Sequence, residues 1–397
     1  MRRLPTRTGD ATTLRRLAFL AVAMLLMIIF GSCSGPQAPA PAETVRELNW
    51  SRIPLPDSVA ASSLTTEANE LLVGGLATSG GDHPVFFVLD STGIAHPVPL
   101  QPNSPYAKVA DLMSLAVRGQ EVVGLGVAHG GAHGNYRWTV WSGSTQRLVD
   151  YPQVFWTFGG EDAGGLLDIV EASDGPVIAG SWANPQGGLD AAVWLRRGQR
   201  WTRQNSAGTA LANTQQLQVA PRAASAFGSA VIISGSVITF GDGVAQSAAV
   251  WTWPTRNSPW TLLRLPDAGR QSEALSTGCK KTCWVSGHAE GKLALWSFDS
   301  VGAGGLARDS TLPSMVIDTD GPGPRTVMSG EQPAVIFSHA GDTTLLVHDS
   351  QDSWQAFSAP AGSVLDATTV GDRLYAIIKI DNAVGLWTTD LGTIRPR

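Results

Sequence analysis

Basic residues are scarce in this chain of 397 residues: Lys and Arg together number 28, and only five of them are lysine. The formal net charge is −5. A chain without a surplus of positive charge lacks the counter-ion release that drives nucleic-acid binding, so we expect no nucleic-acid partner. Charged residues make up only 15% of the chain and hydrophobic residues 43%, which excludes the composition of a disordered protein.

Several catalytic signatures are missing as well. The chain has no G-x-x-x-x-G-K-[ST] loop for a nucleotide phosphate, no H-E-x-x-H zinc helix and no G-x-S-x-G nucleophile turn. His129 and His133 have an H-x-x-x-H spacing, but the glycines between them favour a loop over a helical metal site. We therefore expect no nucleotide, assign no catalytic residue or metal ligand, and predict no cofactor, with Ca²⁺ as the one ion left open.

The N-terminus has the pattern of an export signal. Five arginines precede an apolar run of fourteen residues, Leu17–Phe30. A run of this length matches a signal peptide and is shorter than the roughly 20 residues that span a bilayer. It ends in Gly31-Ser32-Cys33, which resembles the lipobox of bacterial lipoproteins, although Phe30 stands where leucine is usual. The resemblance implies that Cys33 is acylated and becomes the first residue of the mature protein. An uncleaved N-terminal membrane anchor is the alternative.

After Cys33, residues 34–42 read SGPQAPAPA. Alternating proline and alanine favour an extended, semi-rigid backbone that lifts a domain off a surface. We therefore divide the chain into a signal peptide (1–32), a lipidated cysteine with its linker (33–44) and a folded domain (45–397). The expected location is the extracytoplasmic side of a cell membrane, to which the lipid on Cys33 holds the protein.

Two further cysteines, Cys279 and Cys283, lie four positions apart in Gly-Cys-Lys-Lys-Thr-Cys. Residues so spaced can face each other across a tight hairpin with about 5.5 Å between their Cα atoms, which is within range of a disulfide. In an oxidising compartment we expect this disulfide to form and to add about 2 kcal/mol of stability. Free thiols, and a metal site with His288 as the only local third ligand, are the alternatives.

Beyond residue 45 the chain consists of short β-rich runs separated by Gly, Pro, Asp and Ser. One run ends in tryptophan and recurs about every 50 residues, a period typical of propeller blades, each of which is a four-stranded sheet. Its tryptophans are Trp141, Trp194, Trp251, Trp296 and Trp387. A second run of apolar residues and glycine, such as Val285-Ser-Gly287, precedes it. We interpret that glycine as room for a neighbouring sheet.

Seven copies of this unit predict an all-β, seven-bladed β-propeller, with six or eight blades as alternatives. The seventh copy lacks an outer strand because the chain ends soon after Trp387. Residues 45–56 have the pattern of an outer strand but precede the first copy, so we expect them to complete the last blade and close the ring. Closure removes sheet edges, which otherwise promote aggregation. A row of β-sandwich domains would give a two-unit period that the sequence lacks.

The repeated tryptophans hold the same position in five of the seven units, which favours an apolar wedge between blades over a ligand-stacking role. Aromatic residues outside this register fall in connecting loops, where contact residues tend to lie. Two histidines follow their strands at equivalent places. The candidate loop contacts are Phe155, Trp156, Trp182, His288 and His339.

Acidic or polar residues also recur roughly 8 to 12 positions before the second run, where each innermost strand should begin. Innermost strands line the central channel of a propeller, so these side chains would share one rim. The candidate funnel residues are Asp111, Asp168, Glu273, Arg325 and Asp366. Such a funnel suits a cation or a glycan, and two carboxylates about 5–9.5 Å apart could hydrolyse a glycosidic bond. The alternative is structural, with each aspartate capping backbone N–H groups.

Together these features predict a lipid-anchored binding or scaffold module that presents one face to an envelope protein or glycan. The alternative is an envelope glycan-acting hydrolase or lyase that uses the funnel carboxylates. An assembly factor in a secretion or wall-synthesis complex is a third reading, which differs from the first only in its partners.

Overall fold

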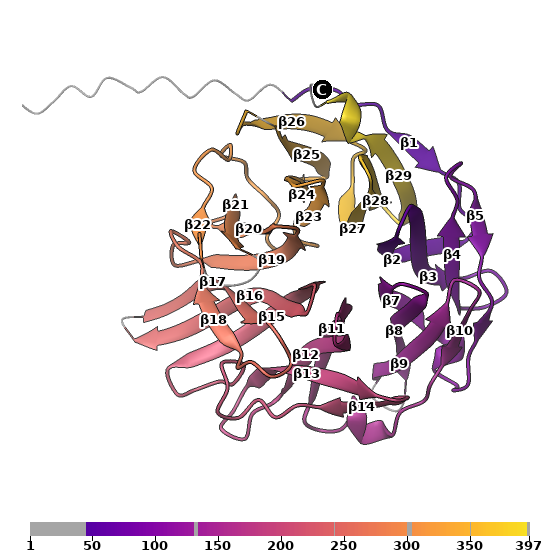
Figure 1. The fold of residues 1–397 in the computed structure, drawn as a ribbon, viewed down its shortest axis with the longest axis horizontal. Coiled ribbons are helices and arrows are strands. Elements are labelled where there is room, and N and C mark those ends of the chain that lie inside the picture. Colours follow the sequence, from indigo (N-terminus) through magenta and orange to yellow (C-terminus); the bar gives the residue numbers. More distant parts are fainter. Residues whose placement is uncertain (1–44, 131–133, 242, 300–303, 350, 395–397) are drawn as a thin grey trace, which may run out of the picture. The chain divides into compact units, whose positions relative to one another are not determined.

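The computed structural model describes residues 45–130, 134–241, 243–299, 304–349 and 351–394. Its strands form seven sheets that surround a central axis, as Figure 1 shows. The prediction of an all-β, seven-bladed β-propeller is therefore confirmed. The predicted signal peptide, the acylation of Cys33 and the Pro/Ala linker lie outside the described residues.

Each blade is an antiparallel sheet whose strands follow one another from the axis outward. The strands of blades 1 to 4 are β2 (Val59–Glu67), β3 (Glu70–Ala77), β4 (His83–Leu89) and β5 (Ala95–Pro97); β7 (Asp111–Arg118), β8 (Glu121–Gly130), β9 (Asn135–Ser144) and β10 (Arg147–Asp150); β11 (Ala163–Ala172), β12 (Gly175–Ala183), β13 (Leu189–Arg197) and β14 (Arg200–Arg203); and β15 (Leu217–Phe227), β16 (Ala230–Gly241), β17 (Gly243–Trp253) and β18 (Thr261–Arg264). The short strand β6 (Leu100–Gln101) adds to blade 2, parallel to β10.

The strands of blades 5 to 7 are β19 (Ser272–Cys279), β20 (Thr282–Ala289), β21 (Lys292–Asp299) and β22 (Ala307–Arg308); β23 (Arg325–Ser329), β24 (Gln332–His339), β25 (Asp342–His348) and β26 (Trp354–Ala359); and β27 (Ser363–Val370), β28 (Arg373–Ile380) and β29 (Ala383–Asp390), with β1 (Ser51–Ile53) outermost. Three 3₁₀ turns complete the described secondary structure: η1 (Ala107–Val109), η2 (Phe155–Thr157) and η3 (Leu391–Thr393). None of these described helices has the length and apolarity to cross a membrane.

The ring closes as expected, because the N-terminal strand β1 pairs antiparallel with β29 of the last blade (Figure 1). Ile53 lies opposite Leu386 and is buried. The preceding residues run along blade 6, where the Trp50 indole N–H donates to the Ser358 carbonyl at 3.0 Å. The paired strand has only three residues, fewer than the segment 45–56, because Pro54 and Pro56 have no N–H to give to a ladder.

A β-bulge interrupts the innermost strand of six blades; in five of them it lies near the recurring glycine of the second strand, and in blade 7 Ile378 takes the place of that glycine. In blade 5 the ladder shifts just after Ala274, which lies opposite Gly287. A Cβ on Gly287 would overlap the carbonyl oxygen of Glu273, and Gly75 and Gly235 are in the same situation in their own blades. Our interpretation of this glycine was therefore wrong about its neighbour: it admits the bulged strand of its own blade.

The repeated tryptophans pack between blades, as the sequence predicts. Trp251 of blade 4 lies in one buried cluster with Val177 and Val193 of blade 3, and Trp296 of blade 5 lies in one with Val250 of blade 4. Both indoles are fully buried. Burial of these large rings between blades stabilises the ring through the hydrophobic effect.

Three of these indoles also donate a hydrogen bond to the loop that enters their own blade. The bonds run from Trp194 to the carbonyl of Thr157 (2.8 Å), from Trp251 to that of Ala210 (2.9 Å) and from Trp296 to that of Pro266 (2.8 Å). The loop that enters blade 7 has only three residues, 360–362. There the buried indole N–H of Trp387 finds no partner within the described chain.

This difference predicts unequal effects of the same substitution. Trp251→Phe removes a hydrogen bond and leaves the Ala210 carbonyl unpaired, which should cost about 1–3 kcal/mol beyond the lost ring volume. Trp387→Phe removes the same volume but no hydrogen bond, so its cost should be smaller by about that amount. Urea unfolding of the two variants and the parent measures both costs. Equal losses would show that the hydrogen bonds to the entering loops contribute nothing.

Candidate functional site

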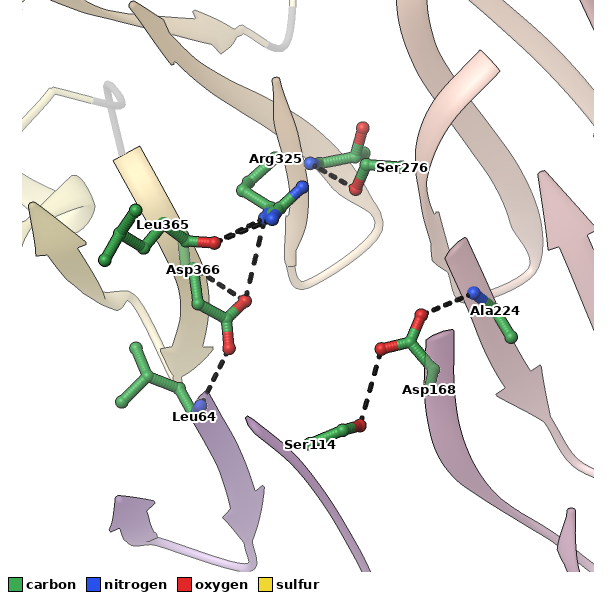
Figure 2. A network of polar contacts seen from close by, with 10 residues as sticks. Leu64, Ser114, Asp168, Ala224, Ser276, Arg325, Leu365 and Asp366 are labelled. Atoms are coloured by element: carbon green, nitrogen blue, oxygen red, sulfur yellow. Dashed lines mark hydrogen bonds and ion pairs between the residues drawn. The ribbon is translucent and has the colours of Figure 1, made fainter. Parts of the chain in front are cut away.

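The seven innermost strands enclose a central cavity of about 440 Å³. Of the five candidate funnel residues, Asp168, Arg325 and Asp366 line this cavity, whereas Asp111 and Glu273 are not among its lining residues. Figure 2 shows Asp168 on one side of the channel and Asp366 with Arg325 across from it. The structure thus brings three of the five together.

Position along the strand explains this division. Asp111 and Glu273 lie before the bulge of their strands, opposite Val127 and His288. Asp168 and Asp366 directly follow the bulge, at equivalent positions of blades 3 and 7. In blade 2 the residue that follows the bulge is Ser114, three positions after Asp111, so the two pairs of acids lie at two levels of the channel.

The side chain that follows the bulge reaches the backbone of the next blade. Asp366 of blade 7 accepts a hydrogen bond from the Leu64 N–H of blade 1, and Asp168 of blade 3 accepts one from the Ala224 N–H of blade 4, each at 2.7 Å (Figure 2). In blade 2 the hydroxyl of Ser114 accepts from the Ile169 N–H of blade 3 at 3.1 Å. These contacts connect neighbouring blades around the channel.

The other three candidates also connect blades. Arg325 donates twice to the Leu365 carbonyl, at 3.0 and 2.7 Å, and its Nε lies 3.9 Å from Asp366 Oδ1. Ser62 of blade 1 donates to Asp111 Oδ1 at 2.5 Å. Between blades 4 and 5, the Arg222 guanidinium pairs with Glu273 Oε1 at 2.7 Å. All five funnel residues therefore make contacts that hold the ring together.

Burial sets the protonation of the channel carboxylates. It raises the pKa of Asp168 to about 6, helped by the negative charge of Asp366 and opposed by the Ala224 N–H and by Arg325. Burial also raises the pKa of Asp366 and of Asp111. The cavity therefore holds carboxyl groups that are harder to ionise than carboxyl groups in water.

Sequence reasoning missed Glu171, which lines the cavity near the far end of β11. Its Oε1 is buried and has no hydrogen-bond partner among the described residues. Burial, and next the charge of Glu121, raise the pKa of Glu171 to about 7. The signal that could have revealed Glu171 was a second acid in the same innermost strand, three positions after Asp168 and directly after the apolar pair Ile169-Val170.

Two smaller expectations can be compared with the structure. Cys279 and Cys283 form a disulfide across the hairpin between β19 and β20, so that prediction is confirmed and its two alternatives are excluded. In the part of the chain that the structure describes, no three His, Cys, Asp or Glu side chains gather closely enough to hold a metal ion. Binding of Ca²⁺ stays a prediction without a built site.

The ring has two unlike faces. One carries the loops that enter each innermost strand and the hairpins between second and third strands; we call it the loop face. The opposite face carries the turns between first and second strands and between third and fourth strands; we call it the turn face. Because the four strands of each blade alternate in direction, every connection of one kind lies on the same face.

Exposed apolar side chains gather on the loop face. Twelve large hydrophobic residues of the described chain are exposed, and ten of them lie in its loops and hairpins. They are Val109, Tyr136, Val154, Phe155, Trp156, Leu189, Phe240, Val244, Val316 and Ile380. The two others are Val45, near the N-terminus, and Ile94, on the turn face.

The largest of these groups lies on the loop that enters blade 3 and on the neighbouring hairpin of blade 2. Trp156 and Phe155 stand 72% and 52% exposed in η2, with ring centroids 5.1 Å apart. Tyr136, at the hairpin between β8 and β9, contacts the rings of His129 and Trp138 at 5.0 and 5.5 Å. Phe155 and Trp156 were expected as loop contacts, whereas Tyr136 was not, because it lies inside a repeated strand.

The remaining loop candidates have partners of their own. Trp182 is half-buried against Trp194, with ring centroids 6.0 Å apart. His288 lies opposite Glu273, and burial lowers its pKa. His339 pairs with Asp318 at 3.3 Å on the loop face. None of these three projects freely in the way that Trp156 does.

Comparison with solved structures shows the propeller fold in proteins of low sequence identity. A puromycin-hydrolyzing peptidase of Mycobacterium tuberculosis is 13% identical with a TM-score of 0.51, over 89% of this chain and 56% of that chain. The acylaminoacyl peptidase of Pyrococcus horikoshii is 9% identical with a TM-score of 0.50, over 87% and 55%. YCF48, in a structure with a bound D1 peptide, is 12% identical with a TM-score of 0.49, over 90% and 99%.

These similarities show the fold alone. This chain spans about half the length of the two peptidases. No family model and no curated protein matches the chain.

The raised pKa of Asp168 predicts a pH dependence of stability. Between about pH 4 and pH 6 the folded chain binds more protons at this residue than the unfolded chain, whose carboxyl has an ordinary pKa near 3.8. The contribution of Asp168 to the free energy of unfolding should therefore fall as the pH rises through this range and level off above it, by at most about 3 kcal/mol.

Asp168→Asn should make the measured fall smaller, because asparagine keeps an oxygen acceptor for the Ala224 N–H but does not ionise; the raised pKa values of Asp366 and Glu171 account for the fall that remains. Denaturant unfolding at pH 4, 5, 6 and 7 measures the effect. Asp57→Asn, at an exposed position, changes the net charge equally and serves as the control. If the pH profile of the Asp168 variant matches that of the parent, burial does not control this carboxyl.

Proposed function

We propose that this chain is a lipid-anchored, extracytoplasmic binding or scaffold module whose loop face contacts an envelope protein or glycan. The supporting observation is the concentration of exposed apolar side chains on that one face. Clustered exposed apolar surface marks interaction sites, because water contact with it is unfavourable until a partner covers it.

The tip of the largest group is rigid enough to serve as a binding surface. The Thr157 N–H donates to the Val154 carbonyl at 2.9 Å, and the Gly159 N–H donates to the Phe155 carbonyl at 2.8 Å. These bonds hold Phe155 and Trp156 in one turn before any partner arrives. A preformed surface loses less conformational entropy on binding than a flexible loop does.

A hydrolase or lyase that uses the channel carboxylates is the second candidate. The pKa of Asp168, raised to about 6, suits a general acid in a cavity. Yet both oxygens of this carboxyl accept hydrogen bonds, from Ser114 and from Ala224. Asp366 likewise accepts from Leu64 and Ala367. Assembly of the blades accounts for these carboxylates, so binding is the better-supported function.

Substitutions on the loop face test the binding proposal. Trp156→Asp places a charge in the centre of the proposed contact and should reduce the capture of partners by chemical cross-linking in intact cells at least tenfold, as at interface hot spots. Ile94→Asp adds the same charge to an exposed apolar position of the turn face and should leave capture unchanged. Equal capture by both variants, with unchanged melting temperatures, would reject the loop face as the contact surface.

The proposed lipid anchor has its own test. Cys33→Ala removes the acylated thiol, so the protein should move from the membrane fraction to the soluble extracytoplasmic fraction. Fractionation followed by detection of the full chain measures this shift. Tight membrane association of the variant would instead mean that the apolar run Leu17–Phe30 stays in place as an anchor.

A further inference from the structure

Arg137 lies within the aromatic group on the loop face. It belongs to β9, next to Tyr136, and is half-buried. Its guanidinium carbon is 5.6 Å from the ring centroid of Tyr106 and 5.6 Å from that of Phe155. Both distances are within the range of a cation–π contact. Two rings from different loops thus contact one cation.

Arg137 lacks an acidic partner in the described chain, unlike the half-buried Arg196 and Arg325. Arg196 pairs with Glu121 at 2.7 Å, and Arg325 lies 3.9 Å from Asp366. The hydrogen bond that the structure gives Arg137 runs from its Nη1 to the Tyr136 carbonyl at 3.1 Å. No carboxylate of the described residues pairs with it. A guanidinium has five N–H donors, so most of its donors remain available.

The backbone holds both rings beside Arg137. Tyr106 precedes η1, and its ring lies where a Cβ on Gly130 would overlap it. Phe155 begins η2 and packs against Gly159. These glycines let the rings approach the hairpin and the turn closely. The two rings lie against the guanidinium of Arg137, and the N–H donors that it does not use in its bond to Tyr136 remain available.

We propose that Arg137 binds a carboxylate of a protein partner, an acidic side chain or a C-terminus that adjoins an apolar residue. This inference rests on the proposed function and names the chemistry of the partner at the same face. A planar guanidinium matches a carboxylate with two parallel hydrogen bonds. Phe155 and Trp156 then receive the neighbouring apolar side chain.

Charge near the site favours a single carboxylate over a polyanion. Glu161 and Asp162 are exposed in the same loop as Phe155 and Trp156. The chain as a whole carries a formal net charge of −5. A membrane of anionic lipids or an acidic polysaccharide would bring many negative charges against these groups, whereas one carboxylate brings only the charge that Arg137 pairs.

The test compares two probes that differ in one charge: N-acetylphenylalanine and its amide, N-acetylphenylalaninamide. Calorimetric titration into the full-length protein in nonionic detergent should give binding of the acid and at least tenfold weaker binding of the amide. Arg137→Gln should weaken binding of the acid at least tenfold. Arg137→Lys keeps the charge but not the paired geometry and should give an intermediate affinity.

Arg147→Gln is the matched control, because it removes the same charge from an exposed arginine on the turn face of the same blade. It should leave binding of the acid unchanged. Equal affinity for acid and amide, no binding of the acid at 50 mM (on the order of a non-specific affinity), or indifference to Arg137→Gln would overturn the proposal. So would Arg137-dependent binding of phosphatidylglycerol vesicles in the absence of binding of the acid.

Failure of this inference can be told apart from failure of the proposed function. If partner capture in cells depends on Trp156 but not on Arg137, the loop face binds and the carboxylate anchor is wrong. If capture depends on neither residue, the loop face is not the contact surface, whether or not N-acetylphenylalanine binds in the calorimetric titration.

Discussion

The β-bulge of the innermost strands is the constraint on which the rest of this propeller depends. It inserts one residue before the position whose side chain reaches the next blade, as Asp366 does toward Leu64 and Asp168 toward Ala224. It also turns a backbone carbonyl toward the second strand, where only glycine leaves enough room, as at Gly287. Bulge, glycine and inter-blade hydrogen bond together form a device that recurs around the axis with variations: blade 7 has Ile378 in place of the glycine, and blade 4 has Ala223, without a polar side chain, after its bulge.

The polar residues of the channel mainly form hydrogen bonds between blades. A carboxylate that accepts hydrogen bonds with both oxygens from neighbouring backbone and hydroxyl groups has few lone pairs left for a ligand. The central cavity is polar chiefly because the blades are joined there, and its polarity is poor evidence of a ligand. The loop face has the opposite character: its hairpins and entering loops hold Phe155 and Trp156 in water, with no partner blade to cover them. Stability thus resides near the axis, and the capacity to bind resides at the tips of the loops.

The sequence predicted those features that recur with the blades. The period, the tryptophan wedge and the N-terminal closing strand could be found because each repeats, or is missing once, at a fixed position. Phe155 and Trp156 stood out because they break the repeat. The sequence could not reveal contacts between residues that are far apart in the chain. Arg137 lies inside a regular strand, and its two aromatic neighbours come from loops about 30 residues before and 20 residues after it. The two levels of the funnel were missed because the acids were aligned only loosely on the second run: Asp111 lies 15 positions before Gly126, whereas Asp168 lies 12 positions before Gly180.

Blade 7 shows how the device adapts where the chain must close on itself. Its strands come from both ends of the described chain, and the three-residue loop that enters it offers the Trp387 indole no carbonyl. The position after its bulge is an aspartate, whereas blades 1, 2 and 5 have serine there. A carboxylate accepts hydrogen bonds more strongly than a hydroxyl, and Arg325 from blade 6 favours its charged form. Arg325 also binds the Leu365 carbonyl at the bulge itself. Arg325 and Asp366 thus join blade 6 to blade 7 at the channel, in the blade whose strands come from both ends of the described chain.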